Sequence, residues 1–327
     1  LVAAVLAVGC SEDPTNDVMV GADDFNNEYI EVTASLESTE SRTSLTDGGN
    51  GGVVAWSEGD KIGAIAEDGT ITEVAATAVN GASATFSVPA NTKYAVYPYA
   101  SGDAFADGKL TKTLGNTVTL DGSNKVFGDN QNVMVAHLSE GTLPFKHLCG
   151  YIEVKLKGTG TVKHVALRSN AQNWDAMSGK GSIDVADAAN PTFTGTSDHG
   201  VTFNWVYANC SNVQLSKSEA TSFYFIVPPR TYENMAICVQ TETGSYAIQA
   251  KNAIQVNRAK IRPIAAIDID NLKPATATNL AEAGVANCYI VPQGAEAKYY
   301  SFPARKINGT ANLENVVYAH LMWSESA

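Results

Sequence analysis

FKHLCGYIEVKL, residues 145–156, is the stretch of sequence that indicates the fold most clearly. From Tyr151 onward its apolar and polar side chains alternate, which is the pattern of a strand with one face in a core. Tyr151, Ile152 and Val154 are also residue types that favour strands. We therefore expect residues 145–156 to form one long β-strand.

Shorter runs of the same kind lie on both sides of this strand, with Gly, Asn and Asp between them. They cover residues 29–34, 53–56, 61–65, 85–88, 94–98, 163–167, 222–227, 235–240, 246–250 and 261–269. Short strands at close spacing, with almost no helical periodicity, are typical of β-sandwiches and barrels. The sequence therefore predicts an all-β protein.

We predict two tandem β-sandwiches, joined near residues 137–146. The N-terminal sandwich is placed at residues 28–143 and the C-terminal one at residues 144–270. Residues 271–327 are predicted to be a linker and a partial third β module, because about 45 residues bury too little apolar surface to form a sandwich alone. We expect the sequence to stop inside that module.

The N-terminal residues carry a second pattern, an apolar run from Leu1 to Gly9 that ends at Cys10. A run of this length is too short to span a bilayer and has the length of a signal-peptide core. A small residue before the Cys and an acidic, Pro-containing stretch after it predict lipidation of Cys10, with residues 1–9 as the remnant of a signal peptide and residues 10–27 as a tether. The alternative is a buried apolar strand with a core Cys.

The amino-acid composition disfavours two classes of binding partner. The 327 residues are 44% hydrophobic and 17% charged, with a net charge of -12. This balance is globular, and it disfavours nucleic acid and anionic lipid head groups, both of which need clustered Lys and Arg. The four remaining cysteines lie in apolar, strand-like runs and are predicted to be core residues rather than disulfide partners. They are Cys149, Cys210, Cys238 and Cys288.

No motif indicates an enzyme, a metal site or a cofactor. The sequence has no P-loop, no HExxH and no CxxC, and its histidines are scattered. Exposed aromatic side chains could stack on a sugar, and Trp56, Trp174 and Trp205 are the candidates. Trp174 is the best of them, because it lies in the polar stretch NAQNWD, residues 170–175. Packing of each Trp against its own domain is the more common alternative.

Several segments together resemble a known family. They are RTSL at 42–45 followed by a Gly-rich loop and WSEGDKI at 56–62, PFKHLCGYIEV at 144–154, FIVPP at 225–229 and NRAKI at 257–261. In this order and spacing they resemble the fimbrillin family (Mfa-like) of surface lipoproteins and type V pilus subunits of Bacteroidales. NCYIVP at 287–292 resembles a module often found after such domains in the same bacteria. The resemblance covers roughly residues 10–270.

That resemblance implies two transthyretin-like sandwiches, anchored by lipid to the outer membrane and displayed as a stalk, tip or anchor subunit of a pilus. In stalk subunits a protease cuts after an Arg between the first two strands, the first strand leaves, and a strand of the next subunit fills its place. The matching residue here is Arg42, which alternatively only begins the next strand, as in uncleaved members. The tail after Asn271 departs from the stalk pattern and favours a tip, an accessory subunit or a non-pilus lipoprotein.

The sequence therefore leaves three hypotheses for the function of the protein. The first is a structural and adhesive pilus subunit, whose partners are other subunits by strand exchange and a host or bacterial surface protein or glycan. The second is a surface glycan-binding lipoprotein that uses Trp174. The third is a surface hydrolase, which no catalytic group of residues in the sequence supports.

Overall fold

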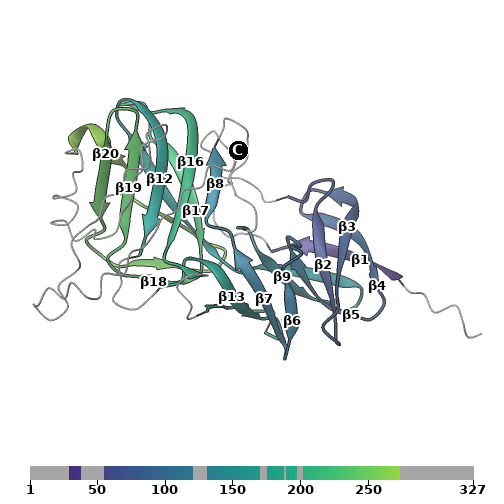
Figure 1. The fold of residues 1–327 in the computed structure, drawn as a ribbon. Helices are drawn as coiled ribbons and strands as arrows, with labels where there is room; N and C mark the ends of the chain where they lie inside the picture. Colours follow the sequence, from purple (N-terminus) through teal and green to yellow (C-terminus); the bar gives the residue numbers. More distant parts are fainter. Residues whose placement is uncertain are drawn as a thin grey trace, which may run out of the picture.

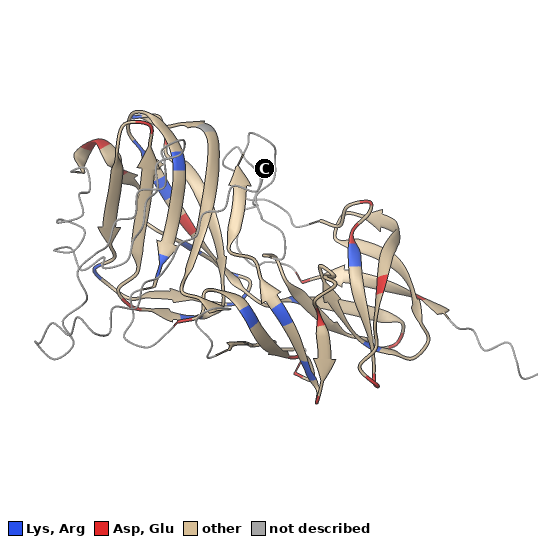
Figure 2. Cartoon of the chain, in the orientation of Figure 1, with Lys and Arg blue, Asp and Glu red and all other residues tan. Residues whose placement is uncertain are grey.

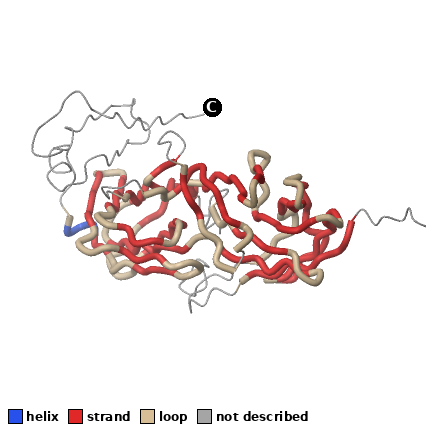
Figure 3. Tube along the Cα trace, turned by 90° about the horizontal axis from the view of Figure 1, so that it is seen from below, coloured by secondary structure: helices blue, strands red, loops and turns tan. Residues whose placement is uncertain are grey.

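The structure, a computed structural model, describes residues 29–37, 55–120, 131–169, 175–187, 189–196 and 202–272. Within them the chain forms strands β1 to β23 and one short 3-10 helix, η1 (Ile269–Asn271). Figure 3 shows how completely strands dominate the trace. The prediction of an all-β protein is confirmed. No helix in these ranges is long and apolar enough to cross a membrane.

The first sheet closes on itself as a barrel, seen on the right in Figure 1. Going around it, the strands are β1 (Tyr29–Leu36), β10 (Thr142–His147), β9 (Met134–His137), β5 (Thr92–Tyr97), β2 (Lys61–Ala66), β3 (Ile71–Asn80) and β4 (Ser83–Pro89). β1 runs parallel to β10 and antiparallel to β4. The barrel core contains Val32, Trp56, Phe86 and Phe145.

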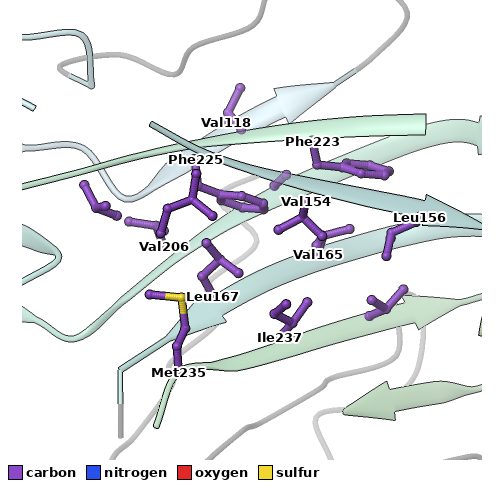
Figure 4. Packing of buried hydrophobic residues seen from close by; sticks show 14 of the residues in the cluster. Val118, Val154, Leu156, Val165, Leu167, Val206, Phe223, Phe225, Met235 and Ile237 are labelled. Carbon is purple, nitrogen blue, oxygen red and sulfur yellow. The ribbon is translucent and has the colours of Figure 1, made fainter. Parts of the chain in front are cut away.

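Two further sheets carry the larger core. One consists of β17 (Thr221–Val227), β11 (Gly150–Lys157), β22 (Ile261–Pro263) and β23 (Ile267–Asp268). The other has the order β20 (Ser245–Gln249), β19 (Ala236–Thr241), β12 (Thr161–Arg168), β16 (Trp205–Gln214) and β8 (Thr117–Leu120). Figure 4 shows apolar side chains of β11 and β17 packing against those of β12, β16 and β19, as in a β-sandwich.

A smaller sheet connects these parts. It consists of β14 (Phe193–Gly195), β13 (Ser178–Asp184), β7 (Lys109–Leu114) and β6 (Ala104–Ala106), and β15 (Thr202–Phe203) also pairs with β13. A separate two-stranded sheet consists of β18 (Arg230–Tyr232) and β21 (Ile254–Val256). A third apolar cluster places Val96 and Val135 of the barrel with Leu110, Tyr151 and Ile183. Strand pairing thus crosses the position of our domain boundary, since β7 and β8 pair with β13 and β16. The division into domains itself stays a prediction.

The expectation of one long strand at residues 145–156 is wrong, because the structure divides it. β10 ends at His147 in the barrel, and β11 begins at Gly150 in a different sheet. At Gly150 a Cβ atom would lie 2.2 Å from the backbone oxygen of Asn257, so only glycine lets the two backbones approach this closely. Apolar residues that favour strands lie on both sides of the break, and they hide it in the sequence.

Two other expected strands also differ from the structure. The run at 261–269 is broken into β22, β23 and η1, and Pro263, which has no backbone N–H to donate, ends the first piece. In the run at 53–56, Ala55 and Trp56 lie outside any strand, and residues 53 and 54 are outside the described ranges. Trp56 is instead fixed by a bond from its backbone N–H to the oxygen of Gly81, 2.8 Å long, and by its ring in the core.

Candidate functional site

The residues singled out in the sequence, Cys10, Arg42 and Trp174, all lie outside the described residues. Their proposed roles in lipidation, cleavage and ligand binding therefore stay predictions. The structure does describe the chain on both sides of the segment that contains Arg42, up to Glu37 and again from Ala55. The candidate site begins with the strand that leads into this segment.

β1 occupies a position between β4 and β10 that we call the β1 slot. Its residues from Tyr29 to Ser35 pair with β4, and those from Thr33 to Leu36 pair with β10. The pairing with β10 includes a bond from the N–H of Thr33 to the oxygen of Gly141, at 3.0 Å. Without an occupant in the slot, the backbone groups of both neighbouring strands would be left unpaired.

The two faces of β1 differ as the sequence pattern requires. Val32 and Ala34 point inward and are 1% and 0% exposed, whereas Glu31, Thr33 and Ser35 are exposed on the other face. The inward face is small, because Ala34 lies opposite another alanine, Ala84 of β4. The slot therefore accepts an extended segment with small or β-branched apolar residues at alternate positions.

Trp56 lies at the centre of the core beneath the slot. Its ring meets those of Phe86, Tyr97 and Phe145 edge-on, with centroids 5.4, 5.0 and 5.4 Å away. The side chain is 5% exposed, so Trp56 is not available for stacking on a sugar. The interpretation of Trp56 as a candidate exposed aromatic residue is wrong, and the more common alternative of packing within the protein holds.

A polar cluster lies at the C-terminal end of β1, and we call it the Glu37 cluster. It consists of Glu37, Lys146, His147 and Arg258. The Arg258 guanidinium donates through Nη2 to Oε1 of Glu37 at 3.1 Å and through Nη1 to Oε2. Nη1 also donates to the backbone oxygen of His147 at 3.2 Å, and the backbone N–H of His147 donates to Glu37 at 3.3 Å. Lys146 adds a second positive charge 3.5 Å from Glu37.

The environment keeps Glu37 ionised. Burial alone would raise the pKa of its carboxyl group, because a charge is poorly solvated there. The hydrogen bonds and positive charge of Arg258, with the charge of Lys146 and the N–H of His147, outweigh this and lower the pKa of Glu37 below its ordinary value. Glu37 is thus an anion held by two cations.

The turn that carries Arg258 is itself tightly held. Ala259 has a positive φ of 55°, and its N–H donates to the oxygen of Cys149 at 2.9 Å. The N–H of Tyr151 donates to the oxygen of Lys260 at 3.0 Å, and Gly150 packs against Asn257. The backbone of the turn that carries Arg258 is therefore fixed in position.

His147 forms the buried side of the cluster and is 1% exposed. Burial is the main reason that its pKa is lowered to about 4; the negative charge of Glu37 opposes this effect, and the positive charge of Arg258 adds to it. His147 is therefore neutral at pH 7. Its Nδ1 lies 3.2 Å from Oδ1 of Asn132, to which the hydroxyl of Tyr151 also donates.

The Glu37 cluster combines two segments that resemble the fimbrillin family, residues 144–154 and 257–261, with the end of β1. Sequence reasoning did not single out Glu37 or Arg258. Glu37 ends an alternating strand, and Arg258 sits in one of the quoted segments. No local pattern relates residues so far apart in the chain.

A row of aromatic side chains forms a second feature. Phe203, Trp205 and Tyr207 follow one another at every second position, with ring centroids 5.2 and 5.0 Å apart. Val206 and Ala208 point into the core, so Trp205 and Tyr207 lie on the opposite face of β16, and Phe203 of β15 precedes them; all three side chains are partly buried. Trp205 was a candidate from the sequence, whereas Phe203 and Tyr207 were not.

Cysteines and charges add no further site in the described ranges. Cys149 and Cys210 are free and buried, as expected of core residues. Cys238 is buried but disulfide-bonded, so the prediction that it is not a disulfide partner is wrong. No group of three or more His, Cys, Asp or Glu that could hold a metal ion occurs among the residues described. Figure 2 shows that the positions of Lys and Arg and those of Asp and Glu are interspersed along the strands.

No protein-family model and no curated protein matches the chain. A solved structure described as a "putative cell adhesion protein" from Bacteroides ovatus is 16% identical, with a TM-score of 0.46, over 76% of this chain and 96% of that one. One from Bacteroides uniformis, described in the same words, is 16% identical, with a TM-score of 0.44, over 75% and 96%. A fimbrial protein from Bacteroides ovatus is 14% identical, with a TM-score of 0.32, over 72% and 49%. Solved structures similar to this chain thus include proteins of Bacteroides that are described as putative cell adhesion proteins and as a fimbrial protein.

Proposed function

We propose that the chain is an adhesive cell-surface protein, and specifically a pilus subunit that assembles by strand exchange. One observation carries this proposal. β1 helps to close the barrel, yet a single backbone cut between Glu37 and Ala55 would separate it from every other barrel strand. Arg42 lies in that interval.

Cleavage after Arg42 would leave β1 held only by noncovalent contacts. Its departure would expose the edges of β4 and β10 and the apolar surface that Val32 and Ala34 cover. An extended segment of another subunit could satisfy both edges and refill the core, which is the physical basis of strand addition. In this proposal Cys10 carries the lipid that moors the chain to the outer membrane, and the lipid leaves with β1.

Treatment of the full chain with an Arg-specific protease tests this proposal. We expect a new N-terminus at Thr43, loss of the segment that ends at Arg42, and concentration-dependent oligomers. An Arg42→Gln variant is the control and should remain intact and monomeric. A wild-type chain that stays whole, or that is cut but never assembles, would contradict exchange. Cys10 would then be a permanent anchor of a tip or accessory protein.

The aromatic row favours a second candidate function, binding of glycans at the cell surface. Rings that follow one another at about 5 Å suit stacking on successive sugars, and Trp174 is predicted to lie in a polar stretch. A glycan array probed with the wild type, Trp205→Ala and Trp174→Ala would decide. Glycan binding lost in either variant supports this candidate, and an array without any bound glycan eliminates it.

A further inference from the structure

We propose that Arg258 selects the strand that enters the β1 slot, by requiring a carboxylate at the position that Glu37 now holds. This inference rests on the proposed strand exchange and names the chemistry of the partner. The occupant would be an extended segment of another subunit. It would carry small apolar residues at the positions of Val32 and Ala34, and a glutamate directly after the last inward residue, at the position of Glu37.

The charges of the cluster create this requirement. Among the described residues, Glu37 is the only carboxylate paired with Arg258, and it is also the partner of Lys146. The side chains of Glu37 and Arg258 are only 16% and 22% exposed, so water replaces a lost partner poorly. A neutral occupant would leave two neighbouring cations without their anion.

The position of Arg258 makes the requirement strict. The turn at residues 257–260 is fixed against residues 149–151 by backbone hydrogen bonds and by the close approach at Gly150. Arg258 is also tied to the backbone oxygen of His147, at the end of β10. The backbone that carries Arg258 is therefore fixed, and the bond to His147 keeps the guanidinium beside the end of the slot when the strand there changes.

The contact between Arg258 and the carboxylate also fixes the register of the strand in the β1 slot. A strand that slips by two residues keeps its apolar face inward, so alternation alone does not distinguish the two registers. Apolar residues occur in β1 at positions 30, 32, 34 and 36, which makes such a slip acceptable to the core. Only the correct register brings the carboxylate after Leu36 to Arg258.

Peptide exchange tests this inference without relying on cleavage at Arg42. The full chain is made with the recognition sequence of a site-specific protease within residues 43–52 and is then cut, so that β1 is held noncovalently. Fluorescent peptides of residues 27–38 compete for the slot as the wild-type sequence, as Glu37→Gln and as Glu31→Gln. Glu31 is the matched control, because it is a glutamate of the same strand that is exposed.

We expect the wild-type and Glu31→Gln peptides to bind equally and the Glu37→Gln peptide to bind about tenfold more weakly. The difference should vanish in protein carrying Arg258→Gln. It should persist with Arg262→Gln, which alters an exposed arginine on the adjacent β22. Urea denaturation verifies that each variant is folded.

Two results overturn the inference alone: equal binding of all three peptides, or a preference for glutamate that survives in Arg258→Gln. In either case strand exchange itself stands. If no peptide enters the slot of the folded, cut protein, the proposed exchange fails and the inference fails with it.

Discussion

Arg258 binds the carboxylate of Glu37 through both terminal nitrogens, although the two residues are 221 positions apart in the chain. Glu37 follows the first described strand, and Arg258 lies in the turn that leads into β22. The contact therefore ties the end of β1 to a part of the molecule outside the barrel. β1 is held by a specific ionic contact as well as by backbone pairing and its apolar face.

Removing one partner of this contact should destabilise the protein. We expect Arg258→Met to lower the free energy of unfolding by about 1.5–3 kcal/mol, because Glu37 is left partly buried without its main donor. Urea denaturation measures this change. Lys61→Met is the matched control, since the ion pair of Lys61 with Glu73 is exposed to solvent and should contribute much less to stability. Equal effects of the two substitutions would show that the Arg258–Glu37 pair contributes no more to stability than an exposed ion pair does.

Acid should weaken the fold through His147. The pKa of this residue is about 4 in the folded protein and 6.5 in an unperturbed histidine, so between these values the unfolded chain binds more protons. Stability therefore falls as the pH falls, by about 2 kcal/mol from pH 7 to pH 5. The lowered pKa of Glu37 has the same direction, but its effect begins near pH 4.5 and increases as the pH falls further.

A comparison of urea denaturation at pH 7 and pH 5 tests this effect. His147→Gln should remove most of the difference between the two pH values, whatever its effect at pH 7. His137→Gln, which alters an exposed histidine of β9, should leave the difference unchanged. A wild-type protein equally stable at both pH values would contradict the neutral, buried state of His147.

Gly150 should tolerate no side chain. Gly150→Ala places a methyl group 2.2 Å from the backbone oxygen of Asn257, so the turn that carries Arg258 must shift. We expect a loss of about 1–3 kcal/mol or more in the free energy of unfolding. Gly102→Ala is the control, because a Cβ atom there meets nothing within 4 Å. If the two variants are equally stable, the turn is not as tightly packed as described.

The ion pair of Lys112 with Asp103 should be costly to break. Lys112 Nζ donates to Asp103 at 2.8 Å and to the oxygen of Pro98 at 2.7 Å, and both side chains are almost fully buried. Lys112→Met leaves the carboxylate buried without its cation, which should cost about 3–5 kcal/mol by thermal or urea denaturation. The double variant Lys112→Met with Asp103→Leu should recover part of this loss. A single variant as stable as the wild type would contradict the burial of the pair.

Much of the fold could be predicted from alternation in the sequence. β1, β4, β12 and β17 all read as strands because one face is buried and the other is not. β3 was missed because its alanines and threonines give little contrast between its faces. β16 was missed although it alternates, and its aromatic residues on the outer face blur the distinction between core and surface. The break at Gly150 could not be found, because its cause is the distant residue Asn257.

The candidate site was less predictable than the fold. The sequence pointed to Cys10, Arg42 and Trp174, whose roles remain predictions. It did not point to Glu37 and Arg258, because a contact across 221 positions depends on the complete fold. The sequence offered one indirect signal for Arg258, because residues 257–261, which carry part of the family resemblance, contain it.

The central claim is that β1 must leave its slot before subunits can join. Ser35 of β1 lies directly opposite Ser83 of β4, so cysteines at both positions should form a disulfide that locks β1 in place. The measurement is the oligomeric state of this double variant after cleavage at Arg42, with and without a reducing agent. We expect monomers while the disulfide is intact and oligomers once it is reduced. Oligomers that form with the disulfide intact would show that β1 need not leave its slot.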